Sequence, residues 1–228
     1  MYRSLLMAGV LGMQVLLATA QEAKSEKAPE TASDIQLTPE EGFAKAKELI
    51  EKQGDFFSAM PLLRPAADAG NVRAQVWLAQ FLDYGEENEE AEKYYRMAIA
   101  QDDPEAKLGL AIMHVAGDTA KPDLAAARQL VEGAANQGFA QAIKILALAY
   151  IKGGLGISDD ERQSTVALTW INRSADLDDI DALRKLEEIY RSGSFAVTLD
   201  EAKADEIQGR INKLTGVEEK TSGRRRRR

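Results

Sequence analysis

The chain has 228 residues, and its 29 Lys and Arg against 37 Asp and Glu give a net charge of -8. It holds one His and no Cys, which excludes disulfides, thiolate zinc sites, iron–sulfur clusters and cysteine nucleophiles, and leaves too few ligands for a histidine-based metal site. A chain of this length forms one sizeable domain or a short array of repeats.

The first 20 residues have the pattern of a secretory signal peptide. Arg3 gives a positive start, an apolar stretch follows, and Ala18-Thr19-Ala20 supplies the small residues that a signal peptidase accepts. An uncleaved membrane anchor is the alternative, but the stretch is shorter than the roughly 20 apolar residues of a spanning helix, and Gln14 interrupts it. We expect cleavage near Ala20, no transmembrane segment afterwards, and a periplasmic or secreted mature protein.

Residues 21–38 mix charged residues with Ser, Thr and Pro, which predicts a disordered linker before a helical domain at 39–214. N-cap and capping-box residues at Thr38/Glu41, Asp103-Pro104, Ser158/Glu161 and Thr198/Glu201 indicate helix starts. The expected helices are 39–53, 56–69, 72–84, 88–101, 104–116, 122–137, 139–152, 161–176, 179–192 and 199–214. The first and the last of these are expected to cap the array with polar faces.

Four segments of the chain repeat one pattern when they are aligned on an alanine. The anchors are Ala74, Ala106, Ala142 and Ala182; four residues later stand Leu78, Leu110, Leu146 and Leu186, and eleven later Gly85, Gly117, Gly153 and Gly193. Fifteen residues upstream stand Ala59, Ala91, Ala127 and Ala167. Steps of four mark one face of a helix, and a following Gly favours a helix end. Each unit is therefore predicted to be a pair of helices that stacks on its neighbours.

The pattern Ala-x-x-x-Leu-x-x-x-Tyr-x-x-Gly, followed by a second helix that ends in an Ala-Ala pair, resembles the Sel-one-like repeat (SLR), a relative of the tetratricopeptide repeat. The resemblance covers about residues 55–193, with Leu82 and His114 in place of the usual Tyr. It implies an all-α fold, an α-solenoid in which about five antiparallel helix pairs form a right-handed superhelix. It also implies an exported, non-catalytic adaptor, because such repeats are similar to envelope scaffolds and regulators, some of them for exopolysaccharide assembly.

In arrays of this kind, the first helix of each pair lines a concave groove, where a peptide or protein partner is expected to bind. We expect the positions two, six and nine residues after each anchor to face this groove. The candidates are Val76, Gln80, Leu108, Ile112, Val115, Lys144, Leu148, Ile151, Arg184 and Arg191. An exposed apolar strip in the middle is typical of a peptide or helix site. The alternative is a buried strip, because residues 108–113 are apolar on all sides.

No pattern of a catalytic or cofactor site stands out. His114 occupies a column held elsewhere by Tyr150 and Tyr190, so we interpret it as a half-buried packing residue. Trp170 lies in a core column, whereas Trp77 is more open. The acidic clusters lack the calcium-loop pattern, and no nucleophile elbow or zinc motif occurs. We expect no enzyme activity, cofactor or metal; a cell-wall-active enzyme is the weakest alternative, because the relatives that suggest it are cysteine-rich.

Residues 215–228 are expected to form a disordered tail that ends in five arginines, Arg224 to Arg228. Their charge opposes that of the acidic remainder of the chain. The arginines could therefore bind anionic polysaccharide or lipid headgroups, lie on the protein's own acidic surface, or be an added tag. Nucleic acid is not an expected partner for an exported acidic protein.

Overall fold

A computed structural model describes residues 37–217; the predicted signal peptide, nearly all of the predicted linker and the arginine run lie outside this range. Over these residues the secondary structure is helical throughout, which confirms the predicted all-α class. In chain order the elements are α3 (Pro39–Glu48), the π-helical turn η3 (Leu49–Gln53), α4 (Phe56–Asp68), α5 (Val72–Tyr84), α6 (Asn88–Ile99), α7 (Pro104–Ala116), α8 (Leu124–Asn136), α9 (Ala140–Lys152), the 3-10 turn η4 (Glu161–Gln163), α10 (Thr165–Asp176), α11 (Ile180–Ser192) and α12 (Glu201–Thr215).

Side-chain caps determine where several helices begin. Thr38 and Glu41 exchange the two hydrogen bonds of the predicted capping box at the start of α3. The carboxylate of Asp103 accepts a hydrogen bond from the backbone N–H of Ala106 at 2.7 Å, also as predicted. These bonds satisfy backbone donors that have no partner inside the helix.

Two of the helix starts that the capping patterns indicated were wrong. Ser158 and Glu161 bond to each other, but only the short turn η4 follows them, and α10 begins after its N-cap Ser164. Similarly, α12 begins after Asp200, whose carboxylate caps it, and not after Thr198. In both cases a second capping residue lies closer to the helix than the one that the sequence pattern indicated.

The repeated columns have the packing roles that the sequence predicts. Every anchor alanine and every upstream alanine is 0% exposed, and the four leucines of the next column are also buried. Small side chains at these points let neighbouring helices approach closely. The Gly column ends helices through a positive φ at Gly117, Gly153 and Gly193. The first repeat differs, because Gly85 has a φ of -77° and Glu86 takes the positive value instead.

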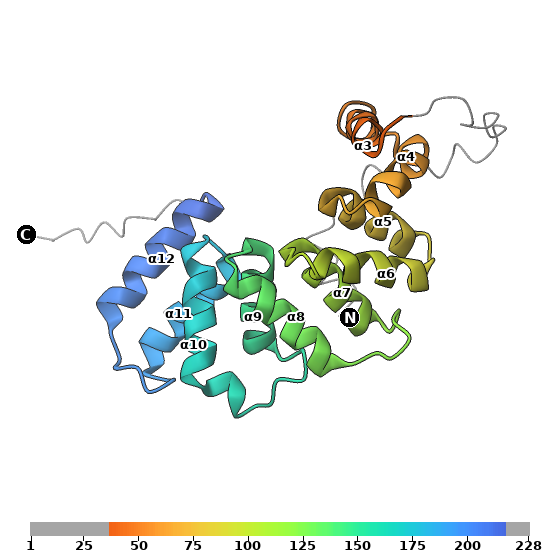
Figure 1. Ribbon diagram of the computed structural model, residues 1–228. Coiled ribbons are helices and arrows are strands. Elements are labelled where there is room, and N and C mark those ends of the chain that lie inside the picture. Colours follow the sequence, from red (N-terminus) through yellow and green to blue (C-terminus); the bar gives the residue numbers. More distant parts are fainter. Residues whose placement is uncertain (1–36, 218–228) are drawn as a thin grey trace, which may run out of the picture. The chain divides into compact units, whose positions relative to one another are not determined.

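The described helices fall into two compact units, divided between Gln141 and Ala142. In the first unit, α3 to α8 pack in chain order, each against the next (Figure 1). Its core includes the large buried side chains of Tyr94 and Tyr95 among the repeat alanines and leucines. The second unit holds most of α9 together with α10, α11 and α12, and its own core includes Ile171 and Ile189.

Arg162 closes the loop that follows α9. Its guanidinium donates hydrogen bonds to the backbone carbonyls of Tyr150 at 3.2 Å and Ile151 at 2.7 Å, in the last turn of the helix. The same loop buries the side chains of Leu155 and Ile157. The glycines of this loop therefore belong to a helix-ending turn with its own apolar anchor.

Ser174 places a polar hydroxyl in the core of the second unit. It stands in a column that holds Ala66, Ala98 and Ala134 in the other repeats, and its buried hydroxyl has no hydrogen-bond partner. Since an unpaired buried polar group costs about 1–3 kcal/mol, Ser174→Ala is expected to raise the free energy of unfolding by about 1 kcal/mol. Urea denaturation tests this, with Ser164→Ala as the opposite control, because that hydroxyl caps α10. Equal losses in both variants would contradict the prediction.

Candidate functional site

The predicted groove positions differ widely in exposure. Val76 is 0% exposed and Leu108 is 4% exposed, so burial prevents both from contacting a partner directly in this conformation. The half-buried positions are Gln80, Ile112, Val115, Lys144, Leu148 and Ile151, and the exposed ones are Arg184 and Arg191. The set is also divided between the two units, because the positions up to Val115 belong to the first and those from Lys144 to the second. Partner binding at the accessible positions stays a prediction.

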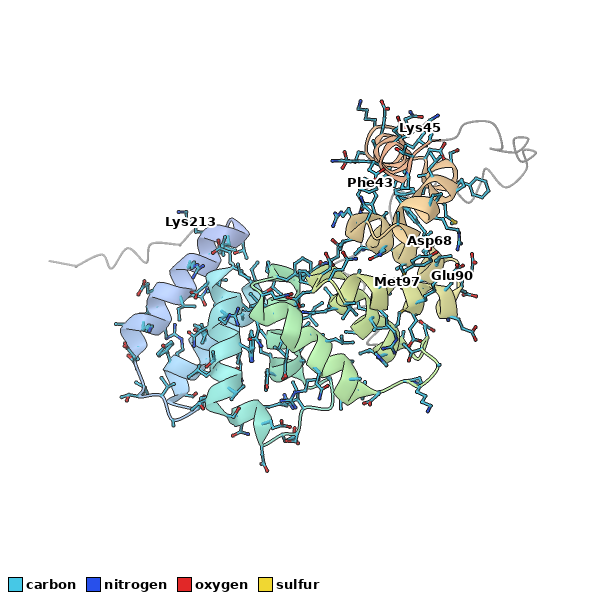
Figure 2. All side chains as sticks on the ribbon, viewed as in Figure 1. Phe43, Lys45, Asp68, Glu90, Met97 and Lys213 are labelled. Atoms are coloured by element: carbon cyan, nitrogen blue, oxygen red, sulfur yellow. The ribbon has the colours of Figure 1, made fainter. Side chains whose placement is uncertain are left out.

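In the first unit, aromatic and polar side chains connect the first helices of three consecutive pairs. Phe43, Arg73, Trp77, Gln80 and Glu105 form this set, which we call the α3–α5–α7 face. The rings of Phe43 and Trp77 contact each other with centroids 5.6 Å apart, and Figure 2 labels Phe43 on α3. The guanidinium carbon of Arg73 lies 5.2 Å from the centroid of the Trp77 ring. An aromatic ring and a cation at this distance attract each other.

Glu105 links α7 to the same part of α5. One oxygen of its carboxylate accepts a hydrogen bond from Arg73, and the other accepts one from Nε2 of Gln80 at 2.8 Å. Glu105 lies in the first turn of α7, where a negative charge interacts favourably with the helix dipole. The carboxylate is therefore held in place by two donors of α5, although 29% of the Glu105 side chain remains exposed.

Tyr95 brings a phenol from α6 towards the polar part of this face. Its ring lies against Gly109 of α7, where a Cβ atom would come within 2.4 Å of ring carbons. Burial raises the pKa of the Tyr95 phenol above its usual range, and the negative charges of Asp83 and Glu105 raise it further. The phenol is therefore neutral at physiological pH and adds no charge to the face.

A second polar cluster connects α4 and α6. Arg64 pairs with Glu90, with 3.1 Å between Nη2 and Oε2, and the hydroxyl of Tyr94 donates to Asp68 at 2.9 Å; Figure 2 labels Asp68 and Glu90. The hydrogen bond from Arg64 lowers the pKa of Glu90, whereas burial and then the bond to Asp68 raise the pKa of Tyr94. Because these groups satisfy one another, we interpret the cluster as a link between two helices.

An open hollow of about 550 Å³ follows the surface of α6. It is lined by Glu89, Glu92, Lys93, Arg96, Met97 and Ala100. Since five of the six belong to α6 and Ala100 is its C-cap residue, the hollow runs along the surface of one helix and does not enclose a ligand as small-molecule sites do.

His114 lies in the core. It is 8% exposed, and its Nδ1 lies 3.2 Å from the hydroxyl oxygen of Thr119. This placement fits the interpretation of His114 as a packing residue. Across residues 37–217, no group of three His, Cys, Asp or Glu is arranged to hold a metal ion, and no helix there is both long and apolar enough to cross a membrane.

Sequence reasoning found only part of the α3–α5–α7 face. It placed Gln80 in the groove and described Trp77 as open, but it missed Phe43, Arg73 and Glu105 as site residues. The expected offsets from each anchor were two, six and nine, whereas Arg73 and Glu105 directly precede their anchors. One pattern in the sequence could have corrected these offsets. Positions 73, 77, 80 and 84 of α5 are not core columns, and their spacing places them on one side of a helix.

Comparisons with known proteins agree with this architecture. No family model matches the chain. Over 160 residues it is 31% identical to the uncharacterized protein NMB1327 of Neisseria meningitidis, a match that covers 68% of this chain but only 32% of the relative, so the chain spans about a third of that protein's length.

Two crystal structures share the fold of the chain. One is c5321, a protective antigen present in uropathogenic Escherichia coli strains that displays an SLR fold; the TM-score is 0.67 at 21% identity, over 77% of this chain and 38% of that one. The other is a Sel1 repeat protein from Oxalobacter formigenes, with a TM-score of 0.60 at 23% identity, over 77% of this chain and 73% of that one. The chain therefore has the all-α solenoid fold of the SLR proteins, as its repeated columns predict.

Proposed function

We propose that the chain is a non-catalytic binding scaffold that holds a peptide segment of a protein partner against the α3–α5–α7 face. The observation that carries the proposal is the partly exposed Trp77, which contacts Phe43 and Arg73 on neighbouring turns and helices. Tryptophan is enriched at the few positions that dominate binding energy in protein interfaces. Stacked helix pairs also give the extended surfaces that repeat proteins use for binding.

The proposed setting is the periplasm or the extracellular space, after removal of residues 1–20. The alternative role, in which Arg224 to Arg228 bind anionic polysaccharide in an envelope assembly, rests on the charge of the sequence alone. The α3–α5–α7 face supports a peptide partner more directly, because it combines an apolar ring pair with a fixed carboxylate.

A random-peptide display selection with the purified protein tests the proposal. We expect enriched peptides whose affinity falls at least tenfold in Trp77→Ala, since truncating a central interface tryptophan commonly costs 2 kcal/mol or more, and about 1.4 kcal/mol corresponds to tenfold. Phe57→Ala is the matched control, because Phe57 is a 79% exposed aromatic residue on α4, outside this face. Its affinity for the same peptides is expected to be unchanged.

The folded state of each variant must be verified, because Trp77 also packs against the core of the first unit. Trp77→Phe therefore serves as a second variant that keeps an apolar ring against the core and loses the indole. Thermal unfolding followed by circular dichroism compares the variants with the wild type. Unchanged peptide affinity in folded Trp77→Ala, or a selection that enriches no peptide, would rule out this face as the binding site.

A further inference from the structure

Trp77 and Glu105 together already hold a guanidinium group. Arg73 lies 5.2 Å from the centre of the Trp77 ring and pairs with the Glu105 carboxylate. An aromatic face beside a carboxylate suits the flat, multiply donating guanidinium group better than the compact ammonium group of lysine. We call Trp77 and Glu105 the cation site, and Arg73 is its occupant in this structure.

We propose that the cation site binds an arginine side chain of a partner peptide, which displaces Arg73. This inference rests on the proposed function and names the chemistry that the face recognises. Displacing Arg73 costs little free energy, because the Arg73 side chain is 51% exposed and exposed ion pairs are weak. A partner arginine would make the contacts with Trp77 and Glu105 that Arg73 gives up. Every further contact between the peptide and the protein then increases the affinity.

The surroundings of the cation site favour a cation over an anion. Gln80 donates to the second oxygen of Glu105 at 2.8 Å, so the carboxylate stays oriented when Arg73 leaves. The chain as a whole carries a net charge of -8, which steers positively charged partners towards it. An acidic peptide would instead have to compete with Glu105 for Arg73.

A peptide array tests the inference directly. Peptides with randomised flanks carry arginine, lysine, citrulline or glutamate at the centre, and the full chain is the probe. We expect at least fivefold stronger binding to the arginine peptides than to those with citrulline, which has a similar shape but no charge. Glu105→Gln is expected to abolish this preference. Arg73→Ala is expected to strengthen arginine binding several-fold, because it leaves the cation site empty.

The direction in which Arg73→Ala changes peptide binding distinguishes an arginine-bearing ligand from an acidic one. Weaker peptide binding in this variant, or a preference of the wild type for glutamate peptides, would overturn the inference, since Arg73 would then contact the ligand itself. Arg210→Ala is the matched control. Arg210 is also an arginine paired with a carboxylate, that of Asp178 in the second unit, and its loss is expected to leave binding unchanged.

The experiment also separates this inference from the function on which it rests. Peptides that bind through Trp77 without any preference for arginine would overturn the cation site and leave the proposed scaffold standing. The arginine run of the chain itself is a second source of the same chemistry. A full-length variant with Arg224 to Arg228 changed to serine is expected to bind arginine peptides with unchanged affinity; a several-fold rise would assign the cation site to the tail instead of a partner.

Discussion

Leu108→Asp is expected to lower the free energy of unfolding by about 3 kcal/mol or more at neutral pH. Leu108 is 4% exposed, so the substitution removes packed methyl groups and places a carboxylate where water cannot solvate it. The same change at half-buried Ile112, one turn later on α7, is expected to cost clearly less. Urea denaturation followed by circular dichroism measures both values.

The loss caused by Leu108→Asp should depend on pH in a defined direction. Desolvation raises the pKa of the introduced carboxyl in the folded state above its unfolded value of about 3.9. Below that value the group is protonated in both states, so the deficit relative to the wild type is smallest there and grows as the pH rises through the folded pKa. A small deficit that is the same at all pH values would show that position 108 is open to solvent, as the groove interpretation requires.

The fold was predictable because packing between stacked helix pairs demands the same residue at the same place in each repeat. Ala74 and Ala106, one repeat apart, are both 0% exposed, and only a small side chain fits at such a close approach. Helix starts were less predictable, since competing caps differ by only about 1 kcal/mol. Ser158 and Ser164 both have capping geometry, and the sequence does not show which of them begins the longer helix.

The α3–α5–α7 face was only partly predictable, because the side of each helix that stays accessible depends on which sides the neighbouring helices cover. Residues 108–113 of α7 are apolar on all sides, so the sequence does not show which side is buried. Leu108 and Ile112 therefore looked equally accessible. Charged and aromatic residues on α5 indicated the accessible side of that helix, since Arg73 is exposed and Trp77 is half-buried. The contact of Arg73 with Glu105 joins residues 32 positions apart and required the structure.

Gly109→Ala is expected to destabilise the protein by about 2 kcal/mol, although alanine is the better helix former. The added Cβ would lie 2.4 Å from two carbons of the Tyr95 ring, and this ring is 2% exposed, which leaves it little room to move. Overpacking of this kind costs about 1–3 kcal/mol or more, which exceeds the gain of up to about 1 kcal/mol from helix propensity. Chemical denaturation of the single variant gives the net value.

A double-mutant cycle assigns the loss to the ring contact. In a Tyr95→Ala background the clash is gone, so adding Gly109→Ala is expected to be neutral or to stabilise by up to about 1 kcal/mol. Gly209→Ala is the control for propensity alone, because a Cβ there meets nothing within 4 Å on α12. Equal gains from Gly109→Ala and Gly209→Ala would contradict the contact. The expected opposite signs would show that Gly109 is needed to admit the phenol of Tyr95 beside α7, close to the carboxylate of Glu105.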